Sequence, residues 1–154
     1  MTDLEPPAQR CLMRTRSAVL NVLMVIAAGI ALSGLLLRQR DQDAVKRGPA
    51  ELGQALLGVL FVVVVASYAT RRFGASRARL RAPETRADRF YRAHLGSAIL
   101  GGLATGLGLC YGWWIRPWLD AVSPFWVASL ALGFLALPRA ELLRGFELPL
   151  PENE

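Results

Sequence analysis

Four long uncharged windows dominate the pattern of hydrophobic and polar positions along the chain. No Asp, Glu, Lys or Arg occurs in residues 17–37, 52–70, 93–115 or 121–138, which are 21, 19, 23 and 18 residues long. A helix rises about 1.5 Å per residue and the hydrocarbon core of a bilayer is about 30 Å thick, so each window is about long enough to cross it. We therefore predict an all-α, integral membrane four-helix bundle made of two helical hairpins.

Composition agrees with a membrane protein and bounds its size. The hydrophobic share is 53% and the mean hydropathy is +0.33, whereas apolar residues make up about 45–50% of typical soluble domains. The 154 residues suffice for a single membrane domain, 1–154. Ser123-Pro124 is expected to begin the last helix as an N-cap and a first-turn proline. The tail 148–154 is expected to be disordered.

Basic residues are divided unevenly among the segments that flank the windows. The start of the chain, the segment 71–92 and the end of the chain hold three, eight and two of them, or 13 in all, whereas the segments 38–51 and 116–120 hold five. Lys and Arg gather in the cytoplasmic loops of membrane proteins. We therefore expect both termini and a basic loop 71–92 to be cytoplasmic, in a bacterial inner (plasma) membrane.

The first window has an alternative interpretation as a cleaved signal peptide. A basic start, an apolar stretch and Ala31-Leu32-Ser33 resemble a cleavage site. The apolar character continues through Leu37, which is longer than the usual h-region of about 7–15 residues. We favour a retained span, and the other three spans do not depend on this choice.

The third window carries a stripe of small residues. Five positions that share one face of a helix are Ala98, Gly101, Thr105, Gly108 and Gly112, and Gly102–Gly106 is a further GxxxG pair. Small residues let membrane helices approach closely. A dinucleotide-binding GxGxxG motif is rejected, because Tyr111 stands where its last glycine would be and no predicted strand precedes it. We expect this face to pack on a helix of this chain or of another chain.

The segment 71–92 suggests contacts with anionic groups. Candidate contacts with anionic lipid or an acidic partner are Arg71, Arg72, Arg77, Arg79 and Arg81. Interleaved aromatic residues, here Phe73, Phe90 and Tyr91, would also suit nucleic acid. The positive-inside rule already requires charge in this segment. Membrane lipid is therefore the expected partner, and nucleic acid is not.

All four tryptophans lie within fourteen residues of one another. They are Trp113, Trp114, Trp118 and Trp126. Tryptophan is enriched where a membrane meets water, so we predict that they anchor one interface. A binding site for a sugar, a quinone or a cation would use the same residues.

Residues that carry chemistry are sparse. His94 is the only histidine and is expected at the membrane interface, because one histidine cannot supply bis-His haem ligation or a His-based metal site without other ligands. Cys11 and Cys110 lie at opposite ends of the predicted topology, too far apart for a disulfide. No Ser/His/Asp or HExxH pattern occurs, and the windows lack the ionisable residues of proton-coupled transporters. We expect no catalytic, cofactor or metal site.

These observations favour a non-catalytic subunit of a homo- or hetero-oligomeric membrane assembly. The small-residue face of the third span is the expected surface of assembly, with other membrane subunits or a second copy as partner. The alternative is a small oligomeric channel or permeation protein with an Arg-rich cytoplasmic vestibule. A cofactor- or lipid-handling enzyme subunit that uses the tryptophans is the third hypothesis.

Overall fold

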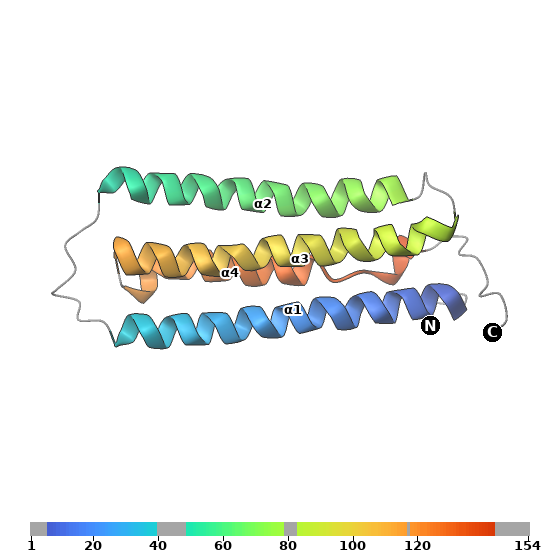
Figure 1. Ribbon diagram of the computed structural model, residues 1–154, viewed down its shortest axis with the longest axis horizontal. Helices are drawn as coiled ribbons and strands as arrows, with labels where there is room; N and C mark the ends of the chain where they lie inside the picture. Colours follow the sequence, from blue (N-terminus) through green and yellow to red (C-terminus); the bar gives the residue numbers. More distant parts are fainter. Residues whose placement is uncertain (1–5, 40–48, 79–82, 117, 144–154) are drawn as a thin grey trace.

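The computed structural model describes residues 6–39, 49–78, 83–116 and 118–143, and they form a bundle of helices (Figure 1). The helices are α1 (Pro6–Arg38), α2 (Ala50–Ala78), α3 (Pro83–Trp114) and α4 (Leu119–Leu135), followed by the short 3₁₀ helix η1 (Ala140–Leu143). The first three are long and apolar enough to cross a membrane, and α4 is a shorter apolar helix of 17 residues. The chain is therefore an integral multi-pass membrane protein with all-α, four-helix packing, as predicted at this level.

The central helix of the bundle is α3. It packs against α1, α2 and α4, and Figure 1 shows α1 and α2 on opposite sides of it. The predicted hairpin of the first two spans is therefore wrong, whereas α3 and α4 do pack together as neighbours. Between His94 and Trp114, α3 carries six glycines. Glycine lets a neighbouring helix approach closely, and here helices approach α3 from more than one direction.

The helices extend beyond the uncharged windows at the basic end of the bundle. α1 starts at Pro6, α2 continues to Ala78 and α3 starts at Pro83, so most of the segment 71–92 is helical rather than a loop. Arg and Ala are good helix formers, and proline is favourable in the first helical turn, so charge marks the membrane boundary without ending the helix. The predicted disordered tail 148–154 lies outside the described residues.

The start of α4 differs from the prediction for a local reason. The helix begins at Leu119, and Pro124 lies inside it rather than in its first turn. Proline has no N–H to donate to the carbonyl four residues back, which here belongs to Asp120. The Ser123 hydroxyl donates to that carbonyl instead, at 2.9 Å. Ser123 thus compensates for Pro124 within the helix and does not cap its start.

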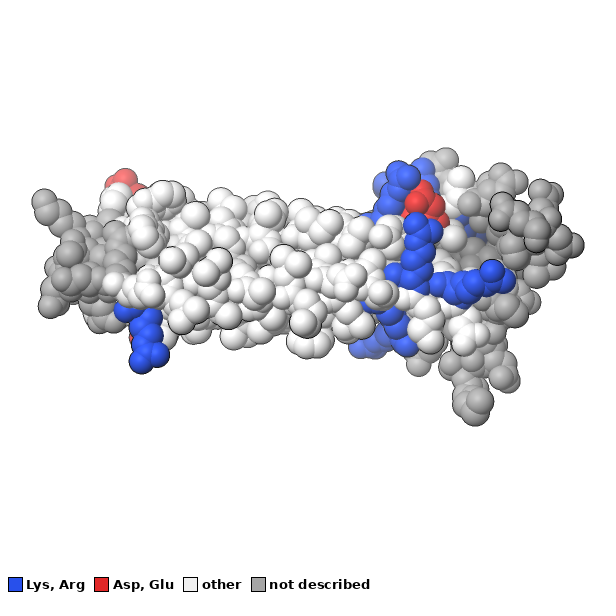
Figure 2. Space-filling view, turned by 60° about the horizontal axis from the view of Figure 1, so that its bottom comes forward, with Lys and Arg blue, Asp and Glu red and all other residues white. Residues whose placement is uncertain are grey.

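The surface has an uncharged middle and charged ends. Figure 2 shows a broad band without Lys, Arg, Asp or Glu, with most of the visible basic side chains at one end. That end joins the start of α1, the end of α2, the start of α3 and η1, where Ala8, Leu12 and Phe90 form a buried cluster with Ala140 and Leu142 against it. We call it the basic end. Many side chains of the middle band are apolar and exposed, among them Met24, Phe61 and Val127, as expected where lipid replaces water.

Candidate functional site

The small-residue stripe of α3 is buried inside this chain. Ala98, Gly101, Thr105, Gly108 and Gly112 are all buried. A β-carbon built at Gly101 would lie 2.8 Å from Cβ of Leu132 on α4. One built at Gly112 would lie 2.6 Å from Cδ1 of Leu37 on α1. The stripe is therefore a packing face, but α4 and α1 of the same chain occupy it, so a partner subunit cannot use it.

The second GxxxG pair has a different environment. Gly102 is half-buried, and a β-carbon built there would be 3.4 Å from Ile26 on α1. Gly106 is exposed, and a β-carbon there would meet no described atom within 4 Å. Ile99 and Leu103, which precede Gly106 by seven and three residues, are 52% and 53% exposed. These positions share one face of a helix, so α3 keeps an open face even though it is the central helix.

Hydroxyl groups join the helices in the middle of the bundle. The Ser67 hydroxyl on α2 lies 2.9 Å from the Ser97 carbonyl oxygen and 3.0 Å from the Ser97 hydroxyl on α3. The Thr105 hydroxyl donates to the Ser129 hydroxyl on α4 at 2.9 Å. All four side chains are buried. The sequence identifies these residues as polar groups within the spans but does not identify the pairs, which stabilise α2 and α4 on α3 in an apolar environment.

The four tryptophans occupy two different environments. Trp113, Trp114 and Trp118 are 42%, 54% and 47% exposed, at the end of the bundle where α3 and α4 meet, as an interface position requires. Trp126 is only half-buried by area, but its indole lies between helices. A β-carbon built at Gly108 would be 3.3 Å from its Nε1, and one built at Gly34 would be 3.6 Å from its Cη2. Trp126 therefore packs between α3 and α1, where glycines make room for it.

Two arginines of the basic end bind carbonyl oxygens at the end of α4 and in the segment just after it. The Arg71 guanidinium on α2 donates through Nη1 to the Leu135 carbonyl oxygen, and Arg16 on α1 donates through Nε to the Pro138 carbonyl oxygen at 3.2 Å. The last carbonyls of a helix lack partners within the helix and carry partial negative charge. Arg71 therefore stabilises the C-terminal end of α4, whereas Arg16 binds the segment that follows the helix. Arg72 and Arg77 are exposed, and Arg79 and Arg81 lie outside the described residues.

Aromatic residues near the basic segment take part in the fold. Phe90 is fully buried against α1. The Arg14 guanidinium lies 5.0 Å from the centre of the Tyr91 ring, within the range of a cation–π contact. Phe73 stays 61% exposed. Two of the three rings that would suit nucleic acid are therefore occupied by contacts within the chain.

His94 is fully buried, not interfacial as predicted. It lies in α3 one turn after Phe90, to whose carbonyl oxygen its Nδ1 donates at 2.9 Å. The two rings pack with centroids 4.2 Å apart. Nε2 has no hydrogen-bond partner among the described residues. The expectation failed because α3 extends three turns beyond His94 toward the basic end and α1 covers that extension.

Neither potential metal ligands nor similarity to known proteins identifies a further site in the part of the chain that the structure describes. Within the described residues, no three or more His, Cys, Asp or Glu side chains form a group that could hold a metal ion. Cys11 and Cys110 are both free thiols. Comparisons with protein-family models, with curated proteins and with solved structures found no match. A functional argument for this chain therefore depends on its surfaces.

Proposed function

We propose that this chain is a non-catalytic subunit of an oligomeric membrane assembly, and that its partner packs on the open face of α3. The observation that carries the proposal is the exposure of Ile99, Leu103 and Gly106 on α3, against which α1, α2 and α4 all pack. A glycine inside a helix weakens it, and no neighbour among the described residues lies within 4 Å of a β-carbon built at Gly106. Glycine at this position suits the close approach of a helix from a second copy or from another subunit.

Replacing Gly106 with leucine tests this proposal. We expect Gly106→Leu to shift the purified protein from a larger complex toward the single 16.8 kDa chain, because the leucine side chain fills the space that the partner helix needs. The measurement is mass by light scattering in detergent, together with recovery of partners that co-purify from native membranes.

Gly58 offers a matched control for this experiment. It is exposed on α2, and a β-carbon built there also meets no described atom within 4 Å. Gly58→Leu should leave the complex intact. Equal assembly of both variants and the wild type would refute the proposed surface. Ion flux through liposomes that contain only the purified protein would support the channel alternative instead.

We further propose that the chain crosses the membrane four times with both termini in the cytoplasm. The gathering of described arginines at the basic end supports this orientation, because basic residues favour the cytoplasmic side. Location in a bacterial inner membrane stays a prediction from the sequence.

Gln9 and Gln39 allow a matched test of orientation. Both are exposed and flank the apolar part of α1 at its two ends. In a background that carries Cys11→Ser and Cys110→Ser, we expect Gln39→Cys to react with a membrane-impermeant maleimide in intact cells. Gln9→Cys should react only after the membrane is opened. The reverse pattern would invert the proposed topology.

A further inference from the structure

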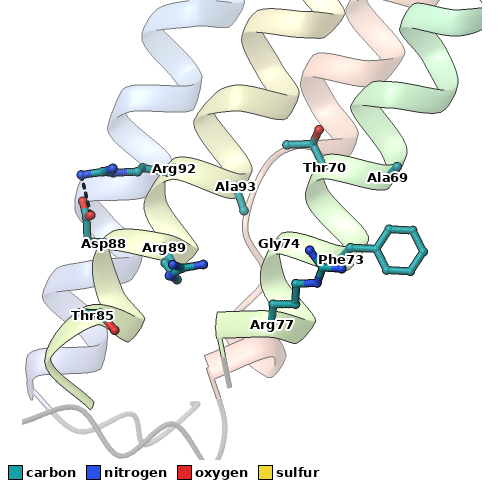
Figure 3. Close-up of a pocket in the computed structure, with 10 residues that line it drawn as sticks. All are labelled: Ala69, Thr70, Phe73, Gly74, Arg77, Thr85, Asp88, Arg89, Arg92 and Ala93. Carbon is teal, nitrogen blue, oxygen red and sulfur yellow. Dashed lines mark ion pairs between the residues drawn. The ribbon is translucent and has the colours of Figure 1, made fainter. Parts of the chain in front are cut away.

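A cavity of about 630 Å³ lies between the end of α2 and the start of α3. Its lining comes from both helices: Ala69, Thr70, Phe73, Gly74, Arg77, Thr85, Asp88, Arg89, Arg92 and Ala93 (Figure 3). The volume falls within the range of small-molecule sites, about 300–1,000 Å³. The cavity is therefore large enough for the headgroup region of a lipid.

The contact between Gly74 and Ala93 fixes how the two helices flank this cavity. A β-carbon built at Gly74 would lie 2.6 Å from Cβ of Ala93, closer than packed atoms can approach. Glycine and alanine thus set a tight contact between the helices that larger residues would prevent. Ala69 and Thr70 lie on the side of this contact toward the middle of the bundle, and Arg77 and Thr85 lie toward the helix ends (Figure 3).

The cationic side of the cavity is formed by Arg77 and Arg89. Arg92 is already engaged, because its Nη2 lies 2.8 Å from the Asp88 carboxylate, and Figure 3 shows this pair on the side of α3 away from α2. Arg89 extends from α3 toward α2 in the same view. In the part of the chain that the structure describes, neither Arg77 nor Arg89 has an ion-pair partner. Two uncompensated guanidinium groups therefore border one cavity.

The other side of the cavity is apolar and continues toward the uncharged band. Ala69, Phe73 and Ala93 contribute to the lining there, and the Phe73 side chain is 61% exposed. The cavity thus joins a cationic wall to an apolar surface, where the uncharged window that ends at Thr70 meets the basic segment. Phospholipid phosphates lie at this boundary in a membrane.

We propose that this cavity binds one anionic phospholipid, with its phosphate between Arg77 and Arg89 and its acyl chains along Phe73 and Ala69. Guanidinium groups bind phosphate oxygens with charge-assisted hydrogen bonds. The apolar lining distinguishes a lipid from free phosphate, since a soluble anion would gain nothing from Phe73. This site does not depend on the proposed assembly surface, which lies farther along α3.

The test is a titration of the purified protein with phosphatidylglycerol or phosphatidylcholine, followed by native mass spectrometry. The first phosphatidylglycerol should bind at least tenfold more tightly than phosphatidylcholine. The double variant Arg77→Gln/Arg89→Gln should lose about 30-fold in affinity for phosphatidylglycerol. Ala69→Phe, which fills the apolar part without a change of charge, should also weaken binding.

Arg10 and Arg72 provide the matched control, because both are exposed at the basic end and neither lines the cavity. Arg10→Gln/Arg72→Gln removes the same charge and should change the affinity less than threefold. An equal loss in both double variants would show bulk electrostatic attraction and overturn the proposal. Displacement of the lipid by equimolar inorganic phosphate would overturn it too, since the site would then bind a free anion. Unchanged affinity in Ala69→Phe would refute the placement of the acyl chains.

Discussion

Gly108→Ala is expected to lower the free energy of unfolding of the bundle by about 1–3 kcal/mol, as overpacking of a tight core does. The added methyl carbon would lie 2.8 Å from Cβ of Phe125, an atom fixed to the α4 backbone. It would also lie 3.3 Å from Trp126 Nε1 and from Val122 Cγ1. No side-chain rotation relieves the contact with a β-carbon, so α4 must move away from α3.

Titration with SDS in mixed micelles, followed by circular dichroism, measures this change. Gly58→Ala is the control, because the same methyl group meets no described atom within 4 Å there. It should be neutral or slightly stabilising, since alanine favours the helix over glycine. If both variants unfold at the same SDS fraction, then the tight contact between α3 and α4 is absent from the folded protein.

Trp126→Ala is expected to destabilise the bundle by about 2 kcal/mol or more, because it leaves a cavity between α4, α3 and α1. The loss arises from packing contacts, which hold membrane helices together where lipid removes most of the hydrophobic drive. Unfolding in SDS measures the effect. The substitution removes the indole that lies next to Gly34 of α1 and Gly108 of α3.

Trp118→Ala separates packing from interface anchoring. Trp118 is 47% exposed and is predicted to serve only as an anchor, so its removal should change the free energy of unfolding by less than about 0.5 kcal/mol. Equal effects of the two substitutions would mean that Trp126 has no special packing role.

Length and charge predict the helices, but they do not predict how the helices are arranged. The uncharged windows identify all four helices, because the thickness of a bilayer sets their length. The row of small residues from Ala98 to Gly112 also predicts a packing face. The stripe does not specify that its partners are α4 and α1, because any helix with side chains of complementary shape can pack against a row of small residues. The central position of α3 likewise depends on how the surfaces of all four helices fit together, which no single helix sequence specifies.

The environments of single side chains were harder to predict for a related reason. His94 and Trp126 are residue types typical of interfaces, and sequence position alone places both near one. Whether such a side chain faces lipid or a neighbour depends on helix rotation, which no local pattern fixes. The small residues Gly34 and Gly108, on two other helices, were the available signal for Trp126. The sequence suggests a lipid contact for Arg71, because the end of α4 that it binds is distant along the chain.

The central place of α3 also determines the order in which this protein can mature. The chain is synthesised from its N-terminus. α1 and α2 are therefore made before α3, the helix on which both pack. They lie on opposite sides of α3 and cannot bury each other's packing faces in the meantime. The Ser67 hydroxyl likewise lacks its hydrogen-bond partner until Ser97 of α3 has been made. Until α3 is inserted, α1 and α2 therefore lack the helix against which both pack in the folded protein.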